Sequence, residues 1–122
     1  MAPKSDNWTR KFIITDPRRH PKGFTVYKVT SIVYPKSSPE AATKVTVWKR
    51  YNDFKKLHKE LHIKHKKLHL KDKFPPFAKG KFFGRYEEEV IEERRQCAIK
   101  LLEFIAEHPP LFTSQVFLKF FE

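Results

Sequence analysis

The chain has 122 residues with 26 Lys and Arg against 14 Asp and Glu, a formal net charge of +12, and this length predicts one domain over residues 1–122. Its single cysteine, Cys97, excludes an internal disulfide framework and is typical of a reducing compartment. No apolar run approaches the roughly 20 residues of a membrane span, and the N-terminus lacks the apolar stretch of a secretory signal, so a cytoplasmic protein is expected.

The first half of the chain has the pattern of β-strands. Residues 9–15 contain a short apolar run, and the segment DPRRHPKG (16–23) that follows has two prolines and a glycine, which indicates a turn or loop. Residues 24–34 are rich in β-branched and aromatic residues, as strands are. Their apolar positions change register between Val26 and Val29, which predicts a bulge or bend in this long strand.

A third strand follows a loop at residues 35–40. In residues 43–49 the side chains alternate, with Val45 and Val47 on one face and polar or aromatic residues on the other. Because the three strands are joined by short connections, we expect an antiparallel meander.

Helical spacing replaces this alternation after Phe54. Leucines recur three or four residues apart and predict a helix from about 52 to the mid-60s. The segment KFPPFAKGKFFG (73–84) cannot continue it, because adjacent prolines favour an extended, polyproline-like (PPII) loop. Acidic YEEE then opens a second long helix that runs to His108 and stops at Pro109.

The last predicted element is a short helix over residues 113–121, with Thr113 or Ser114 as its N-cap. The predicted fold class is therefore α+β: a three-stranded antiparallel β-meander packed against a helical subdomain, with the proline-rich loop between the first two long helices.

Arg94 is an unusual residue for its position. It lies four residues after Val90 and four before Ala98, on the apolar stripe of the second long helix. A cation there is costly unless an anion meets it. Spacing alone leaves three interpretations open: a ligand-binding arginine, a salt bridge with a buried glutamate, or a side chain that reaches out to solvent.

Arg50 and Tyr51 stand where the third strand meets the first helix, within the sequence WKRYNDF (48–54). A solvated arginine is common in a basic protein. The adjacent ring changes this interpretation, because a flat aromatic side chain beside an arginine can form the floor of a pocket for a ring-shaped polar ligand. The planar guanidinium also matches the oxygens of a phosphate.

Three segments in this order, RYNDF, FPPFAKGKFFG and VIEERR, resemble the phox homology (PX) domain family, a phosphoinositide-binding module. The resemblance extends from about residue 10 to residue 121. It implies that Arg50 holds the 3-phosphate of phosphatidylinositol 3-phosphate, that Tyr51 lies against the inositol ring, and that Arg94 contacts the ring hydroxyls at positions 4 and 5.

The resemblance also assigns roles within the proline-rich segment. Either Lys79 or Lys81 matches the lysine that takes the 1-phosphate. Phe82 and Phe83 match positions where the family places apolar residues that enter the bilayer, and packing beneath the second long helix is the alternative for them.

The expected function is recruitment of a larger, multidomain parent protein to endosomal membranes during membrane trafficking and sorting. The expected partners are a phosphoinositide headgroup, an anionic membrane surface and other endosomal sorting proteins, and attachment would be peripheral and reversible. No cofactor and no nucleic acid are expected.

Other functions fit the sequence less well. Nothing resembles a nucleophile elbow, a phosphate-cradling glycine loop or paired catalytic carboxylates, so an enzyme is not expected. His58 and His62 suggest a metal site, but no obvious set of ligands completes it, and a basic, solvated helix face is the preferred interpretation. The alternative function is a basic protein- or nucleic-acid-interaction domain without a selective lipid pocket.

Overall fold

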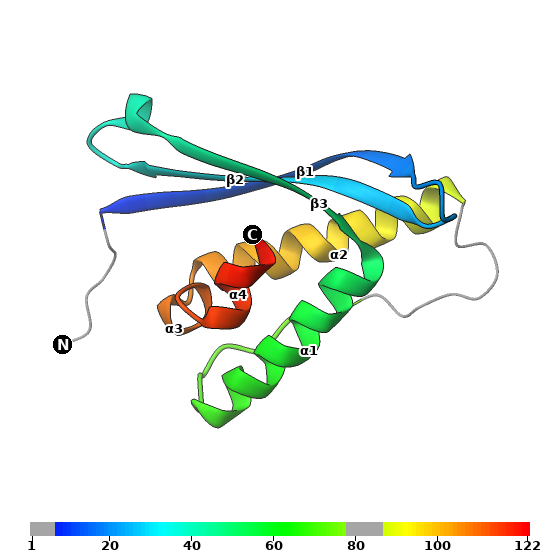
Figure 1. Ribbon diagram of the computed structural model, residues 1–122. Helices are drawn as coiled ribbons and strands as arrows, with labels where there is room; N and C mark the ends of the chain where they lie inside the picture. The colour runs from blue at the N-terminus through cyan, green and yellow to red at the C-terminus, as the bar shows by residue number, and fades with distance from the viewer. Residues whose placement is uncertain (1–6, 78–86) are drawn as a thin grey trace.

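The computed structural model of the protein describes residues 7–77 and 87–122. Strands β1 (Trp8–Arg19), β2 (Thr25–Pro35) and β3 (Thr43–Arg50) form one antiparallel sheet in the order β1-β2-β3. Figure 1 shows that helices α1 to α4 all lie on one side of this sheet. The predicted α+β meander is therefore confirmed.

Strand β1 is longer than predicted, and the prediction of a loop at residues 16–19 is wrong. From Thr15 to Arg18 the strand advances three residues while its partner advances two, from Lys28 to Val26, so β1 carries a bulge. Asp16 has a φ of 51°, a left-handed conformation that aspartate tolerates better than most residues. The bulge therefore lies in β1 and not in the second strand, where it was predicted, since β2 pairs with β3 without a register shift. Strand β1 continues past Pro17.

The β1–β2 connection is a tight turn. The backbone N–H of Gly23 donates to the carbonyl of His20 at 2.8 Å, and the N–H of His20 donates to the carbonyl of Phe24 at 2.7 Å. Gly23 has a φ of 97°, which glycine adopts without a steric cost. The turn brings Phe24 to the end of the sheet where β3 finishes.

Two long helices follow the sheet. Helix α1 spans Tyr51–Lys67, as predicted, and α2 spans Glu88–Ala106. The predicted continuation of α2 to His108 is wrong. His108 is extended, with φ −126° and ψ 94°, because a residue before proline is disfavoured in the helical conformation.

Three short helical segments complete the described fold. A 3₁₀ turn, η1, covers Pro39–Ala41 within the predicted loop, and α3 covers Pro109–Phe112. Helix α4 covers Gln115–Phe120, and the Ser114 hydroxyl accepts a hydrogen bond from the N–H of Phe117 at 3.3 Å. Ser114 is therefore the N-cap that one of the two sequence alternatives predicted.

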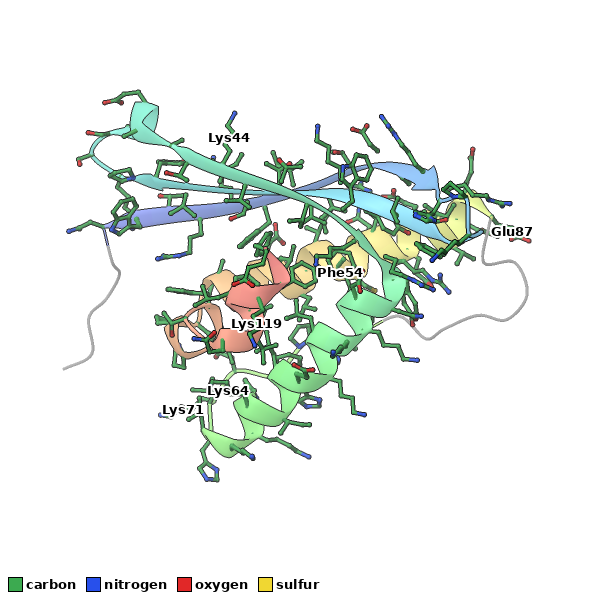
Figure 2. All side chains as sticks on the ribbon, in the orientation of Figure 1. Lys44, Phe54, Lys64, Lys71, Glu87 and Lys119 are labelled. Carbon is green, nitrogen blue, oxygen red and sulfur yellow. The ribbon has the colours of Figure 1, made fainter. Side chains whose placement is uncertain are left out.

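The hydrophobic core lies between the sheet and the helices. The sheet supplies side chains from all three strands, and Figure 2 shows Phe54 of α1 beneath the sheet. The most completely buried large side chains are Phe54, Ile14, Leu61, Leu101, Leu102, Ile105, Leu111 and Val29. Within residues 7–77 and 87–122, no helix is long and apolar enough to cross a bilayer.

Candidate functional site

The site is built at the corner between β3 and α1. Arg50 is extended, with φ −104° and ψ 168°, and is the N-cap of α1. The carboxylate of Asp53 accepts a hydrogen bond from the backbone N–H of Arg50 at 2.9 Å. An aspartate in the first turn also suits the positive end of the helix dipole. The corner is thus fixed by local hydrogen bonding, and the Arg50 guanidinium is left to other contacts.

The Arg50 side chain rests on an aromatic ring from the β1–β2 turn. Its guanidinium carbon lies 3.8 Å from the ring centroid of Phe24. The ring of His20 stacks on Phe24, with centroids 4.5 Å apart and planes 9° apart. A guanidinium on an aromatic face is held by its flat side, which leaves its N–H groups at the edge for a planar acceptor such as phosphate.

A second stack forms beside the first and joins three distant parts of the chain. The Arg94 guanidinium carbon, on α2, lies 3.9 Å from the ring centroid of Tyr51, on α1. Tyr51 in turn stacks on Phe77, from the proline-rich segment, with centroids 5.6 Å apart and an interplanar angle of 21°. The fold thus brings Arg94 and Tyr51 together.

Arg94 is a half-buried cation with an unsatisfied donor. Its Nε atom is buried and has no hydrogen-bond partner. The stripe that it interrupts is buried as predicted, since Val90 is 3% exposed and Ala98 is 1% exposed. A buried donor left without an acceptor is costly, so Arg94 is a natural place for an anionic or hydroxyl-bearing ligand to bind.

Both nearby tyrosine hydroxyls are influenced by Arg94. Burial raises the pKa of Tyr51 above its ordinary value, and the Arg94 guanidinium acts in the opposite direction. Burial likewise raises the pKa of Tyr27 to about 12, with Arg94 again opposing the shift. The two hydroxyls therefore stay protonated at neutral pH, and that of Tyr27 donates a hydrogen bond to the carbonyl of Ile91 at 3.0 Å.

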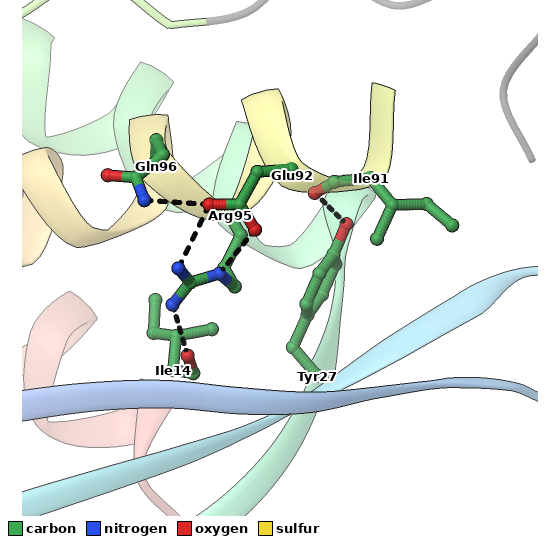
Figure 3. A network of polar contacts seen from close by, with 6 residues as sticks. All are labelled: Ile14, Tyr27, Ile91, Glu92, Arg95 and Gln96. Carbon is green, nitrogen blue, oxygen red and sulfur yellow. Dashed lines mark hydrogen bonds and ion pairs between the residues drawn. The ribbon is translucent and has the colours of Figure 1, made fainter. Parts of the chain in front are cut away.

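Arg95, the next residue, has a different environment (Figure 3). It donates to both carboxylate oxygens of Glu92 at 2.9 Å and to the carbonyl of Ile14 at 2.7 Å. The contact with Ile14 ties α2 to β1, whereas the ion pair with Glu92 lies within α2. Arg95 is therefore a structural residue, and Arg94 is the arginine of this pair that has a donor to offer a ligand.

Some predicted site residues lie outside the described part of the chain. Lys79 and Lys81, the two alternatives for the 1-phosphate, belong to residues 78–86, as do Phe82 and Phe83, the candidates for membrane insertion. Arg50, Tyr51 and Arg94 are the predicted site residues that the structure describes.

Sequence reasoning missed two aromatic side chains that support the site. Phe24 was assigned only to the apolar set of the second strand, and Phe77 only to the proline-rich loop. Each lies more than 25 positions from the site residue that it contacts, Arg50 or Tyr51. The available signal was weak: each is an aromatic residue beside a turn-forming segment.

The solvated histidine face expected on α1 is present only in part, because His62 is exposed whereas His58 is half-buried and His65 is buried. His65 is 7% exposed, and His58 is partly buried, with its Nε2 2.7 Å from the carbonyl of Pro75. The cause is Phe74, which stacks on the ring of His62 at 4.8 Å and packs against His58 and His65. Within the described residues, no three His, Cys, Asp or Glu side chains are grouped as metal ligands.

Two hollows lie elsewhere on the molecule. One of about 610 Å³ lies between the end of the β1–β2 hairpin and the start of α2, where Arg18 and Arg19 are opposed by Glu88 and Glu92. The other, of about 420 Å³, lies between α1 and α4 and also has mixed charge. Acidic residues in the walls of both hollows disfavour an anionic ligand there.

Comparison with known proteins agrees with the site motifs. The model of the PX domain family matches residues 37–122. Ribosomal protein S6 kinase delta-1 of Homo sapiens is 52% identical over 120 residues, which is 98% of this chain and 11% of that protein. Sorting nexin-15 of Bos taurus is 46% identical over 117 residues, which is 95% of this chain and 34% of that protein.

A solved structure has the same fold. The X-ray structure of a designed CISK-PX domain superposes with a TM-score of 0.71 at 24% identity, covering 92% of this chain and 98% of that chain. The chain spans about a ninth of the kinase and a third of the sorting nexin. The family match and the two relatives show that this chain belongs to the PX domain family.

Proposed function

We propose that this PX domain binds a phosphoinositide headgroup, with phosphatidylinositol 3-phosphate as its preferred ligand, and recruits a larger parent protein to endosomal membranes. The observation that carries the proposal is Arg94, whose guanidinium lies 3.9 Å above the Tyr51 ring while its buried Nε has no partner. An anionic ring with phosphate and hydroxyl groups supplies the acceptor that this donor lacks.

Each residue of the site has a distinct role in this proposal. Arg50, held flat on Phe24, meets the 3-phosphate, and Tyr51 contacts the inositol ring. Arg94 hydrogen-bonds the ring hydroxyls, and Lys79 or Lys81 takes the 1-phosphate. Phe82 and Phe83 enter the bilayer. The net charge of +12 adds nonspecific attraction to an anionic leaflet and speeds encounter, while the site selects the lipid.

The proposed role is binding, without catalysis. One relative is a kinase by name, but the match covers only 11% of that protein, and the family matched here is the PX domain. The relatives named sorting nexin-15 and vacuolar protein sorting-associated protein vps5, the latter of Schizosaccharomyces pombe, support a role in membrane sorting.

Liposome co-sedimentation against a panel of phosphoinositides tests the proposal. Near physiological salt, Arg50→Ala should abolish selective binding to the 3-phosphorylated lipid. Arg10→Ala is a matched control, because Arg10 also lies 3.8 Å above a phenylalanine ring, that of Phe112, but outside the site. Binding that follows total anionic charge, and that both variants weaken equally, would exclude a selective pocket and favour the alternative of a basic interaction domain.

A further inference from the structure

The sheet has a second face that the helices leave uncovered. In Figure 1, α1 to α4 all lie below the sheet, and Figure 2 shows Lys44 on the opposite side. The buried residues Tyr27 and Val29 define the covered face of β2, so the even-numbered residues of β2 lie on the other one. The strand register then identifies their neighbours on β1 and β3. We call this surface the outer sheet face.

The register places cations and apolar side chains side by side on this face. On this face, one row across the three strands contains Lys11, Ile32 and Lys44. Two rows further along the same face, the row contains Thr15, Lys28 and Trp48. Ile13, in the row between them, is 45% exposed, and Trp48 is 43% exposed. The side chains used in the argument below are Lys11, Ile13, Arg18, Lys28, Lys44 and Trp48.

Within the described strands, no paired position of the outer sheet face is acidic, and Arg18 is the one of its named cations that also lines a hollow with Glu88 and Glu92. Strands β2 and β3 contain no Asp or Glu, and the only acidic residue of β1 is Asp16, which lies in the bulge outside the paired positions. The chain has 14 acidic residues, and the helices and connections hold the others. A partner for this face must therefore bring negative charge.

The chemistry of the face selects among anionic partners. The Lys11 ammonium lies 5.8 Å from the ring centroid of Tyr34, and the Arg18 guanidinium carbon 5.1 Å from that of Trp48, so cations already occupy ring faces that nucleic-acid bases would need for stacking. The exposed aliphatic side chain of Ile13 suits an aliphatic partner. Membrane insertion favours protruding tips, whereas this apolar surface is set into a flat sheet among cations.

We infer that the outer sheet face is a docking surface for an acidic protein segment that carries aliphatic side chains among its carboxylates. The carboxylates meet Lys11, Lys28 and Lys44, and the aliphatic groups cover Ile13 and the exposed part of Trp48. Charge complementarity identifies the partner, and the inference does not depend on the proposed lipid site, because Lys11, Lys28 and Lys44 are not residues of that site.

A defined peptide tests the inference. A short fluorescein-labelled peptide of repeated Glu-Glu-Leu should bind the chain near physiological salt, as measured by anisotropy, and Lys11→Glu/Lys44→Glu should weaken binding by about tenfold or more. Lys59→Glu/Lys66→Glu is the matched control, since it makes the same change in net charge at exposed positions of α1. It should change affinity by less than about twofold. Arg50→Ala should leave peptide binding intact.

A second readout reports from the face itself. With Trp8→Phe, Trp48 becomes the only tryptophan, and its fluorescence should change when the peptide binds. A Gln-Gln-Leu peptide that binds equally well, or equal weakening by both double variants, would overturn the inference. So would an oligonucleotide or a phosphatidylserine vesicle that binds this face in place of the acidic peptide. Loss of peptide binding in Arg50→Ala would assign the contact to the lipid site instead.

Discussion

Arg94 and Arg95 are consecutive residues of α2 with opposite environments. Arg95 has its guanidinium enclosed by the Glu92 carboxylate and the carbonyl of Ile14 (Figure 3). Arg94 has a buried Nε without a partner and lies over the Tyr51 ring. Within the described residues, the fold satisfies the Arg95 guanidinium and leaves the Arg94 Nε without a partner.

The difference gives a physical criterion for function. Both residues are arginines on the same helix turn, so residue type does not separate them, although periodicity places Arg94 and not Arg95 on the apolar stripe. What separates them is whether the folded chain supplies acceptors for the guanidinium. Satisfied donors contribute to stability, whereas an unsatisfied buried donor costs stability that only binding recovers.

The largest expected effect on stability is that of Arg95→Ala. The substitution removes the ion pair with Glu92 within α2 and the hydrogen bond to the carbonyl of Ile14, which joins α2 to β1. Because hydrogen bonds to charged groups are the stronger ones, we expect the free energy of unfolding to fall by about 2 kcal/mol. Urea denaturation followed by circular dichroism measures it. An unchanged denaturation midpoint would show that these contacts carry no net stability.

Arg94→Ala should change phosphoinositide affinity more than stability, the reverse of what is expected for Arg95→Ala. Losing the contact with Tyr51 should lower the free energy of unfolding by only about 0.5–1 kcal/mol, partly offset because the unsatisfied Nε is removed too. Phosphoinositide affinity should fall by about tenfold, the effect of losing one charge-assisted contact.

The same liposome and denaturation assays on both variants test this comparison directly. A large loss of stability in Arg94→Ala with unchanged lipid affinity would reverse the two assignments. Arg94→Lys sharpens the test, because lysine keeps the charge but cannot lie flat on Tyr51 or present a planar fork, so an intermediate affinity is expected.

Much of the fold was predictable because its local patterns agree with the final structure. The alternation in residues 43–49 and the leucine spacing after Phe54 predicted β3 and α1 closely. The extension of β1 past Pro17 was not predictable in this way. It depends on the left-handed conformation of Asp16 and on pairing with Val26, and only the neighbouring strand determines that pairing.

The site was predictable to a smaller extent. Periodicity placed Arg94 on the apolar stripe, and the motif RYNDF marked Arg50 and Tyr51. The rings beneath them, Phe24 and Phe77, arrive from segments far away in sequence. No local pattern encodes such a contact, because tertiary packing alone decides which ring lies under which cation.

Tyr27→Phe should have a smaller effect, and that effect should be on stability and not on lipid binding. The Tyr27 hydroxyl donates to the carbonyl of Ile91 at 3.0 Å, a second link between the sheet and α2. Its loss should lower the free energy of unfolding by about 1 kcal/mol and leave phosphoinositide affinity unchanged. If lipid affinity fell instead, the hydroxyl would belong to the binding site and not only to the fold.

The smallest expected effect concerns the acid titration of Glu92. Hydrogen bonds from Arg95 and Gln96 lower the pKa of this carboxyl from its ordinary value of 4.5 to about 2. Because the folded-state pKa is depressed, its stabilising contribution is present above pH 4.5 and is lost as the pH falls toward 2. Glu92→Gln should therefore reduce the slope of stability against pH within this window.

This effect is small because the Glu92 side chain is 53% exposed and solvent screens the pair. Urea midpoints measured at a series of pH values, with an NMR titration of the carboxyl, would detect it. Arg95→Ala should return the pKa of Glu92 toward 4.5, since it removes the largest cause of the shift, whereas Arg94→Ala should leave it near 2. If the pKa of Glu92 shifted equally in both variants, the two arginines would act on this carboxyl through net charge alone. The proposed difference between a satisfied and an unsatisfied guanidinium would then be wrong for Glu92.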